Sequence, residues 1–402
     1  MPAGTSIAYV CGILRGITGV GLDQSLLLDV VKRARESGAS EVNQWVAWLV
    51  ESEAASQVPE QLLSIISDIA INDPDPEEDA WWTQHDEDPA SAGLNCTRGA
   101  AAYAIASLLR QDPTRLDRLN PAVAALVTDK TVQVRVMAIR ALLPVLDIDL
   151  DTALDLFHAC VDVVDHRLLA ARSVETFLNR AIHAGHYLEV ADVLGLMISS
   201  QTVSARRAGA RQLTFASSLY LDLDQRVDEL FASDDDQGRA GVVETFAFLA
   251  REGYRPDRCL AVLSAGFDDP SGAVREAATH CFRGLEQHLL DDHLRAVTMR
   301  FLASSSFPEH AGDLLLPLDG TTRPLPNWVL DVCERYVVLE GSAIGNLATR
   351  SAFLGYHLVN IVIRMHVQQT DSEVRRRCLD LIDRLLVLGA HDIDKELTSI
   401  ER

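Results

Sequence analysis

The sequence has 402 residues, of which 48% are hydrophobic and 6% aromatic, and its formal net charge is −22. This length suffices for a large core, and the low aromatic content favours stacked helices over a β-sandwich or an α/β enzyme. Proteins that bind nucleic acid normally carry a basic surface, so the acidic balance argues against a nucleic-acid partner.

The cysteines are scattered, without the C-x-x-C spacing of a redox or zinc motif. An odd set of unpatterned thiols predicts free cysteines in a reducing compartment. The apolar stretch Ile7–Leu22 carries Arg15 and has no basic start, so it predicts neither a signal peptide nor a membrane span. We therefore predict a cytoplasmic protein without membrane association. The seven cysteines are Cys11, Cys96, Cys160, Cys259, Cys281, Cys333 and Cys378.

Residues 1–71 are predicted to form N-terminal helical repeats. Asp23 and Ser40 are suitable N-caps, because their side chains can accept from the free backbone N–H groups at a helix start. Gly38 is a suitable stop between two of these helices.

Residues 72–93 interrupt this helical pattern with prolines and a high density of acids. Three interpretations stay open. The segment is a disordered acidic linker, or it binds a partner through Trp81 and Trp82, since tryptophan is enriched at binding hot spots. The third is a metal site at residues 85–88 (His-Asp-Glu-Asp), although this run lacks a known ligand spacing.

A short phrase recurs through residues 94–305. In its clearest copy a loop aspartate, Asp129, precedes Val132-Gln-Val-Arg135 and apolar residues at helical spacing. A similar phrase begins at Asp268, and another, beyond this range, begins at Asp371. The marker arginines are separated by 37, 37, 35, 32 and 36 residues, which is typical of stacked helix pairs. These markers are Arg98, Arg135, Arg172, Arg207, Arg239 and Arg275.

The loop aspartate followed by Val-Arg-x-x-Ala resembles the second helix of HEAT repeats. The resemblance implies an all-α fold, a right-handed α-solenoid (superhelix) of stacked antiparallel helix pairs of the HEAT/armadillo-like type. It also implies a ladder of charge-assisted hydrogen bonds between successive units. The ladder members by resemblance are Asp129 with Arg135, Asp268 or Asp269 with Arg275, and Asp371 with Arg375.

Prolines punctuate residues 306–328, which we predict to be a Pro-rich loop. The positions are Pro308, Pro317, Pro324 and Pro326. Residues 329–402 are predicted to form C-terminal HEAT-like repeats and a polar cap.

The phrase Leu94-Asn-Cys-Thr-Arg-Gly-Ala-Ala-Ala102, placed after an acidic loop with tryptophans, resembles the C-terminal helical repeats of bacterial STAND/NACHT-type NTPases. Those proteins act in signalling and phage defence. The sequence has no Gly-x-x-x-x-Gly-Lys-Ser/Thr loop, so the resemblance concerns a sensor or recognition arm and not the ATPase.

The sequence contains no recognisable catalytic frame, such as His-Glu-x-x-His or Gly-x-Ser-x-Gly. His183 and His186 are a conceivable ligand pair, but surface histidines at a helix end are commoner. We predict no catalytic, cofactor-binding or metal residues. The expected function is a non-catalytic scaffold that binds a protein partner through its concave face. The alternative is a HEAT-like enzyme, such as a DNA glycosylase or a bilin lyase. The oligomeric state stays open.

Overall fold

The computed structural model describes Gly12 and residues 23–36, 41–53, 58–76, 89–162, 166–289 and 291–390. These residues are predominantly helical and contain no strand, which confirms the prediction of an all-α fold. No helix among them is long and apolar enough to cross a membrane. The α-helices are α2 (Gln24–Glu36), α3 (Val42–Glu53), α4 (Glu60–Asn72), α5 (Pro89–Leu94), α6 (Thr97–Gln111), α7 (Leu116–Val127), α8 (Val132–Ile148), α9 (Leu150–Val161), α10 (Arg172–His183), α11 (Tyr187–Ile198), α12 (Val203–Leu219), α13 (Asp224–Phe231), α14 (Asp236–Arg251), α15 (Pro256–Phe267), α16 (Gly272–Thr279), α17 (Asp292–Ala303), α18 (Phe307–Gly320), α19 (Trp328–Ile344), α20 (Arg350–Gln368) and α21 (Ser372–Val387).

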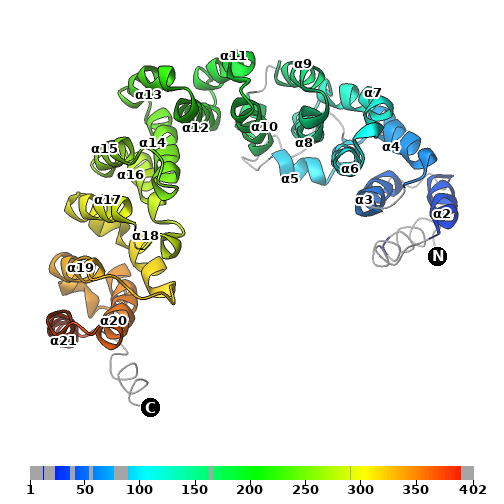
Figure 1. Ribbon diagram of the computed structural model, residues 1–402. Helices are drawn as coiled ribbons and strands as arrows, with labels where there is room; N and C mark the ends of the chain where they lie inside the picture. Colours follow the sequence, from blue (N-terminus) through cyan, green and yellow to red (C-terminus); the bar gives the residue numbers. More distant parts are fainter. Residues whose placement is uncertain are drawn as a thin grey trace. The chain divides into compact units, whose positions relative to one another are not determined.

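The chain divides into two compact units, residues 1–212 and 213–402. In the first unit, α6, α8 and α10 pack side by side in one layer, and α4, α7, α9 and α11 form a second layer against them. In the second unit the two layers are α14, α16, α18, α20 and α15, α17, α19, α21. Helices adjacent in sequence therefore pair across the two layers of each unit, as Figure 1 shows.

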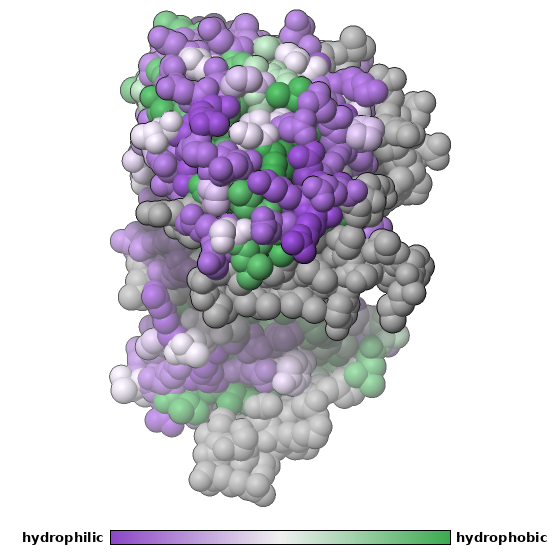
Figure 2. All heavy atoms as spheres, turned by 90° about the vertical axis from the view of Figure 1, so that its right-hand side faces the viewer, coloured by the Kyte–Doolittle hydropathy of each residue, from purple (hydrophilic) through white to green (hydrophobic). Residues whose placement is uncertain are grey.

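Side chains of low volume bring α5, α6 and α8 close together. The alanines at 100, 101, 102 and 104 of α6 are all fully buried. Gly93 and Gly99 sit where the backbones approach most closely, because a Cβ on Gly99 would lie 2.0 Å from the carbonyl oxygen of Gly93. Residue 99 must therefore be glycine because the Gly93 backbone leaves no room for a side chain, and not because of an unusual backbone angle. On the face drawn in Figure 2, hydrophobic residues form small groups between hydrophilic ones.

Replacing Gly99 with alanine is expected to reduce the free energy of unfolding by about 3 kcal/mol, because backbone atoms cannot yield as a flexible side chain can. The matched control is Gly195→Ala in α11, where nothing lies within 4 Å of an added Cβ. That substitution is expected to stabilise by about 0.5–1 kcal/mol, since glycine inside a helix is entropically unfavourable. Urea unfolding of both variants measures the difference, and equal effects would contradict the packing account.

The predicted Pro-rich loop over residues 306–328 is wrong for most of its length, because α18 occupies Phe307–Gly320. Pro308 lies in the first turn, where its missing N–H has no helical partner to lose. Pro317 lies inside the helix, which persists because Leu314, Leu315 and Leu318 are fully buried. The irregular segment is restricted to residues 321–327.

The acidic segment predicted at 72–93 is described only at its ends. Helix α4 ends at Asn72, and α5 begins at Pro89, so the predicted loop boundary of 93 falls inside a short helix. Trp81, Trp82 and residues 85–88 lie outside the described residues.

Six cysteines in the described part of the chain are free and buried. Burial raises the pKa of the Cys96 and Cys160 thiols to about 12 and of Cys259 and Cys378 to about 11. Burial likewise raises the pKa of Cys281 and Cys333. These thiols are therefore packing residues and not nucleophiles, since the thiolate is the reactive form.

A raised thiol pKa means that the native state retains a proton that the unfolded chain releases above a pH of about 8.5. Stability from these groups is complete below that pH and declines as pH rises towards 11–12. Each fully buried thiol should contribute a loss of about 2 kcal/mol by pH 10. Urea unfolding at several alkaline pH values checks this, and Cys160→Ala should flatten the dependence. An unchanged slope in that variant would contradict the assignment.

Candidate functional site

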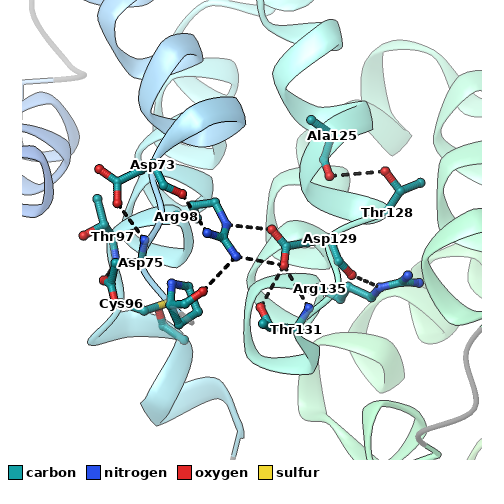
Figure 3. A network of polar contacts seen from close by, with 12 residues as sticks. Asp73, Asp75, Cys96, Thr97, Arg98, Ala125, Thr128, Asp129, Thr131 and Arg135 are labelled. Atoms are coloured by element: carbon teal, nitrogen blue, oxygen red, sulfur yellow. Dashed lines mark hydrogen bonds and ion pairs between the residues drawn. The ribbon is translucent and has the colours of Figure 1, made fainter. Parts of the chain in front are cut away.

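A buried ion pair joins α6 to the turn that precedes α8 (Figure 3). The Arg98 guanidinium donates from Nε to Asp129 Oδ2 at 2.7 Å and from Nη2 to Oδ1 at 3.2 Å. Their side chains are only 7% and 9% exposed. Arg98 also donates to the carbonyl oxygens of Asp73 and Pro76, at 2.7 and 3.1 Å. The Arg98 guanidinium therefore joins the start of the acidic segment, residues 73–76, to the turn that precedes α8.

The second unit repeats this arrangement. Arg239 donates from Nε and Nη2 to the two carboxylate oxygens of Asp269, both at 3.1 Å, over a separation of 30 residues. It also donates to the carbonyl oxygen of Ser233, six residues earlier. Three more arginines donate to a carbonyl oxygen six residues earlier. Each of these bonds joins the first turn of a helix to the loop that precedes it. The three arginines are Arg135, Arg206 and Arg275.

In the predicted ladder pair of Asp129 with Arg135, the two side chains do not bind each other. Asp129 accepts from Arg98 of the preceding unit, while Arg135 donates to the backbone oxygen of Asp129 and to that of Cys160. Arg135 is six residues after Asp129. At this separation an arginine in the first turn of a helix can donate to a carbonyl oxygen of the loop just before that helix. The marker of the fourth repeat is Arg206 in this role, one residue before the predicted Arg207.

The alternative left open between Asp268 and Asp269 is resolved by their partners. Asp269 pairs with Arg239, and its backbone oxygen accepts from Arg275. The carboxylate of Asp268 instead accepts from the backbone N–H and the hydroxyl of Ser305, at 2.8 and 2.9 Å.

The last predicted pair acts locally. Asp371 caps α21 by accepting from the backbone N–H of Glu373 at 2.8 Å. The backbone N–H of Arg375 donates to the carbonyl oxygen of Asp371, as in an ordinary first helical turn. Arg377 links α21 to α19, the previous helix of the same layer, because its guanidinium binds Glu334 and Asp331. Sequence reasoning missed Arg377 because it occupies a variable position of the Val-Arg-x-x-Ala motif, two residues after Arg375.

These charged networks are structural, and the candidate site is a polar pocket on the α16–α18–α20 layer. Its volume is about 400 Å³. Helix α16 and the 3₁₀ turn η5 (His280–Phe282) form one wall of the pocket, and α18 forms a second wall. Arg350, at the start of α20, forms the third side. The other polar lining residues are Glu276, Thr279, His280, Arg283, His310 and Asp313.

The polar groups in this pocket are ordered by neighbouring carboxylates. The Thr279 hydroxyl lies 2.9 Å from Asp313 Oδ2, and the Nδ1 atom of His310 lies 3.4 Å from the same oxygen. His280 Nδ1 is 3.7 Å from Glu244 Oε1. His280 Nε2 lies 2.6 Å from Arg283 Nη2 and accepts from it, because a guanidinium can only donate.

Exposed hydrophobic side chains lie along the same row of helices. Leu316 lines the pocket and is 41% exposed. Phe353 is 56% exposed and is one turn after Arg350, and Phe248 is 44% exposed and is one turn after Glu244. The Arg251 guanidinium lies over the Phe248 ring and donates to the carbonyl oxygen of Arg283 at 2.9 Å. Leu316 is the member of this group that lines the pocket. We call Phe248, Leu316 and Phe353 the apolar rim, a name for the three exposed side chains on this layer.

The sequence offered little signal for this pocket, because its histidines are isolated in the chain and its members come from three separate segments, 276–283, 310–317 and residue 350. His183 and His186, the pair considered from sequence, lie at the end of α10 and just before α11. His186 contacts Glu189. The described residues contain no group of three or more His, Cys, Asp or Glu side chains that could hold a metal ion.

Comparison with protein-family models gives no match, and comparison with curated proteins gives no match either.

Proposed function

We propose that this chain is a non-catalytic helical-repeat scaffold that binds a protein partner. In this proposal the two units belong to a right-handed, HEAT-like α-solenoid, and the α14–α16–α18–α20 layer lines its concave side. Solenoids of stacked helix pairs commonly use that side as an extended binding surface. A recognition arm of a bacterial signalling or defence system is the biological role that we propose for it.

The observation that supports partner binding is the apolar rim on the layer that carries the polar pocket. Phe248, Leu316 and Phe353 are large hydrophobic side chains exposed on α14, α18 and α20, three helices of one layer. Binding hot spots combine hydrophobic anchors with arginine and are surrounded by polar groups. Here Arg283 and Arg350 lie in the pocket that Leu316 also lines.

Site-specific photocrosslinking in the host tests this proposal. A photoreactive residue at 316 or 353 should crosslink to one protein. Position 338 is the matched control, because Val338 is 61% exposed but belongs to α19 in the opposite layer. Equal crosslinking from all three positions, or crosslinking to nucleic acid, would count against the proposal.

The crosslinked protein should then be purified and titrated against variants. Phe353→Ser and Phe248→Ser are each expected to weaken binding by about 30-fold, as loss of an aromatic hot spot costs about 2 kcal/mol. Val338→Ser should leave the affinity unchanged. A partner that binds all three variants equally would contradict the placement of the surface.

A further inference from the structure

We propose that the polar pocket receives a single anionic group, a carboxylate or a phosphoryl group carried by a polypeptide, between Arg283 and Arg350. This inference rests on the proposed function and specifies what the partner presents to the pocket. Four observations support it: the partners of the two arginines, the partners of the pocket acids, the shape of the cavity and the balance of charge.

The two pocket arginines are paired only with neutral acceptors. Arg283 donates to the ring of His280, and Arg350 donates to the carbonyl oxygen of Glu309. Within the described residues, neither guanidinium forms an ion pair with a carboxylate. Other arginines of this unit do so, since Arg258 binds Asp224 and Asp228. A guanidinium has five N–H donors, so both arginines retain donors for a ligand.

One of the two carboxylates that line the pocket, that of Asp313, is already engaged. Asp313 Oδ2 accepts from the Thr279 hydroxyl at 2.9 Å and lies 3.4 Å from the His310 ring. The Thr279 contact ties the Asp313 side chain of α18 to α16, on the neighbouring wall. Among the described residues no carboxylate forms a direct ion pair with either arginine, and an oxyanion matches the planar fork of a guanidinium better than any other ligand group.

The shape of the pocket suits an anionic side chain with an aliphatic stem. The volume of about 400 Å³ exceeds that of a carboxylate, and Leu316 and Pro317 supply apolar wall for the remainder. Gly312 gives Arg350 its position over α18, because a Cβ at residue 312 would lie 3.0 Å from Arg350 Nη2. A ligand that extends out of the pocket would meet the apolar rim.

The charge balance favours one anionic group over a polyanion. Glu276 also lines the pocket and is exposed, so a ligand with several adjacent negative charges would be repelled at close range. The whole chain carries a formal charge of −22, which opposes the approach of nucleic acid. A polypeptide with an isolated acidic or phosphorylated residue is repelled less by Glu276 and by the net charge of the chain than a polyanion is.

Protection of arginines from phenylglyoxal tests the inference on the full, unmodified chain, so no variant has to fold. Inorganic phosphate and acetate are the probes, added at constant ionic strength, and digestion with mass spectrometry gives the modification rate of each arginine. Modification of Arg283 and Arg350 should slow at least fivefold with one of the probes. Arg376 is the internal control, because it is 64% exposed and lies on α21 outside the pocket.

The two probes separate the sources of the anion. Stronger protection by phosphate assigns a phosphorylated residue, and stronger protection by acetate assigns a carboxylate. Protection that is equal at Arg376, or absent with both probes, would overturn the inference. Stronger protection by a single-stranded oligonucleotide than by either probe would overturn the assignment to a polypeptide.

The affinity of the better probe, measured from line broadening of its NMR signal, should fall at least tenfold in Arg350→Gln and remain unchanged in Arg376→Gln. Equal affinities for both variants would contradict the site. If rim positions crosslink a protein but neither probe protects, the inference fails and the proposed function stands. If a probe protects and no protein is crosslinked, the pocket binds anions and the proposed function fails.

Discussion

Replacing Arg98 with methionine is expected to reduce the free energy of unfolding of the first unit by about 3–5 kcal/mol. The substitution leaves the carboxylate of Asp129, which is only 9% exposed, without its bidentate partner. It also removes the donors to the carbonyl oxygens of Asp73 and Pro76. A buried charge that loses its partner cannot regain full hydration, and this is the largest part of the expected cost.

Urea unfolding followed by circular dichroism measures the effect. Arg376→Met is the matched control, because its pair with Glu373 is exposed and surface pairs contribute little. The double variant Arg98→Met with Asp129→Leu should recover part of the loss, since no charge is then left buried. An Arg98→Met variant as stable as the control would show that the pair is not a principal support of the repeat.

Replacing Phe301 with alanine is expected to destabilise the second unit by about 3–5 kcal/mol. The Phe301 ring is fully buried between three other phenylalanine rings, with centroid distances of 5.0, 4.9 and 5.3 Å. These rings belong to Phe267, Phe282 and Phe307. The substitution leaves a cavity between elements on both layers, where a fixed helix stack can collapse only partly.

Phe353→Ala is the control for this substitution, because Phe353 is 56% exposed and its loss should cost less than about 1 kcal/mol. Hydrogen exchange should show the largest loss of protection in α15, α17 and α18, since nearest neighbours carry most of the stability of a repeat stack. Similar midpoints for the two variants would mean that the aromatic cluster is not the core of this unit.

The repeated phrase in the sequence predicted helices well because its apolar spacing is local information. It predicted partners less well. Asp129 is the residue that joins two units, but its partner Arg98 lies 31 residues earlier, and Arg135 within the same phrase binds the backbone instead. Which arginine reaches which aspartate depends on how far one helix pair is displaced along the next, and no local pattern records that displacement.

The prolines of residues 306–328 misled the prediction for a different reason. Proline opposes a helix by removing a donor, but Pro308 occupies a position that needs none, and the burial of Leu314 and Leu318 outweighs the cost at Pro317. The polar pocket was beyond prediction, since Arg283, His310 and Arg350 meet only after three helices have packed. Their residue types gave no motif at any fixed spacing.

Arg98 binds both Asp129 and the segment at residues 73–76, and this limits where the protein can be cut into fragments. A fragment that begins after Arg98 would expose Asp129 without its cation, and a fragment that ends before Asp129 would leave the guanidinium without its acid. Trimming the segment that contains the Asp73 and Pro76 carbonyl oxygens would remove two more acceptors. Truncations of the first unit therefore keep their contacts only if residues 73–76, Arg98 and Asp129 remain in one piece.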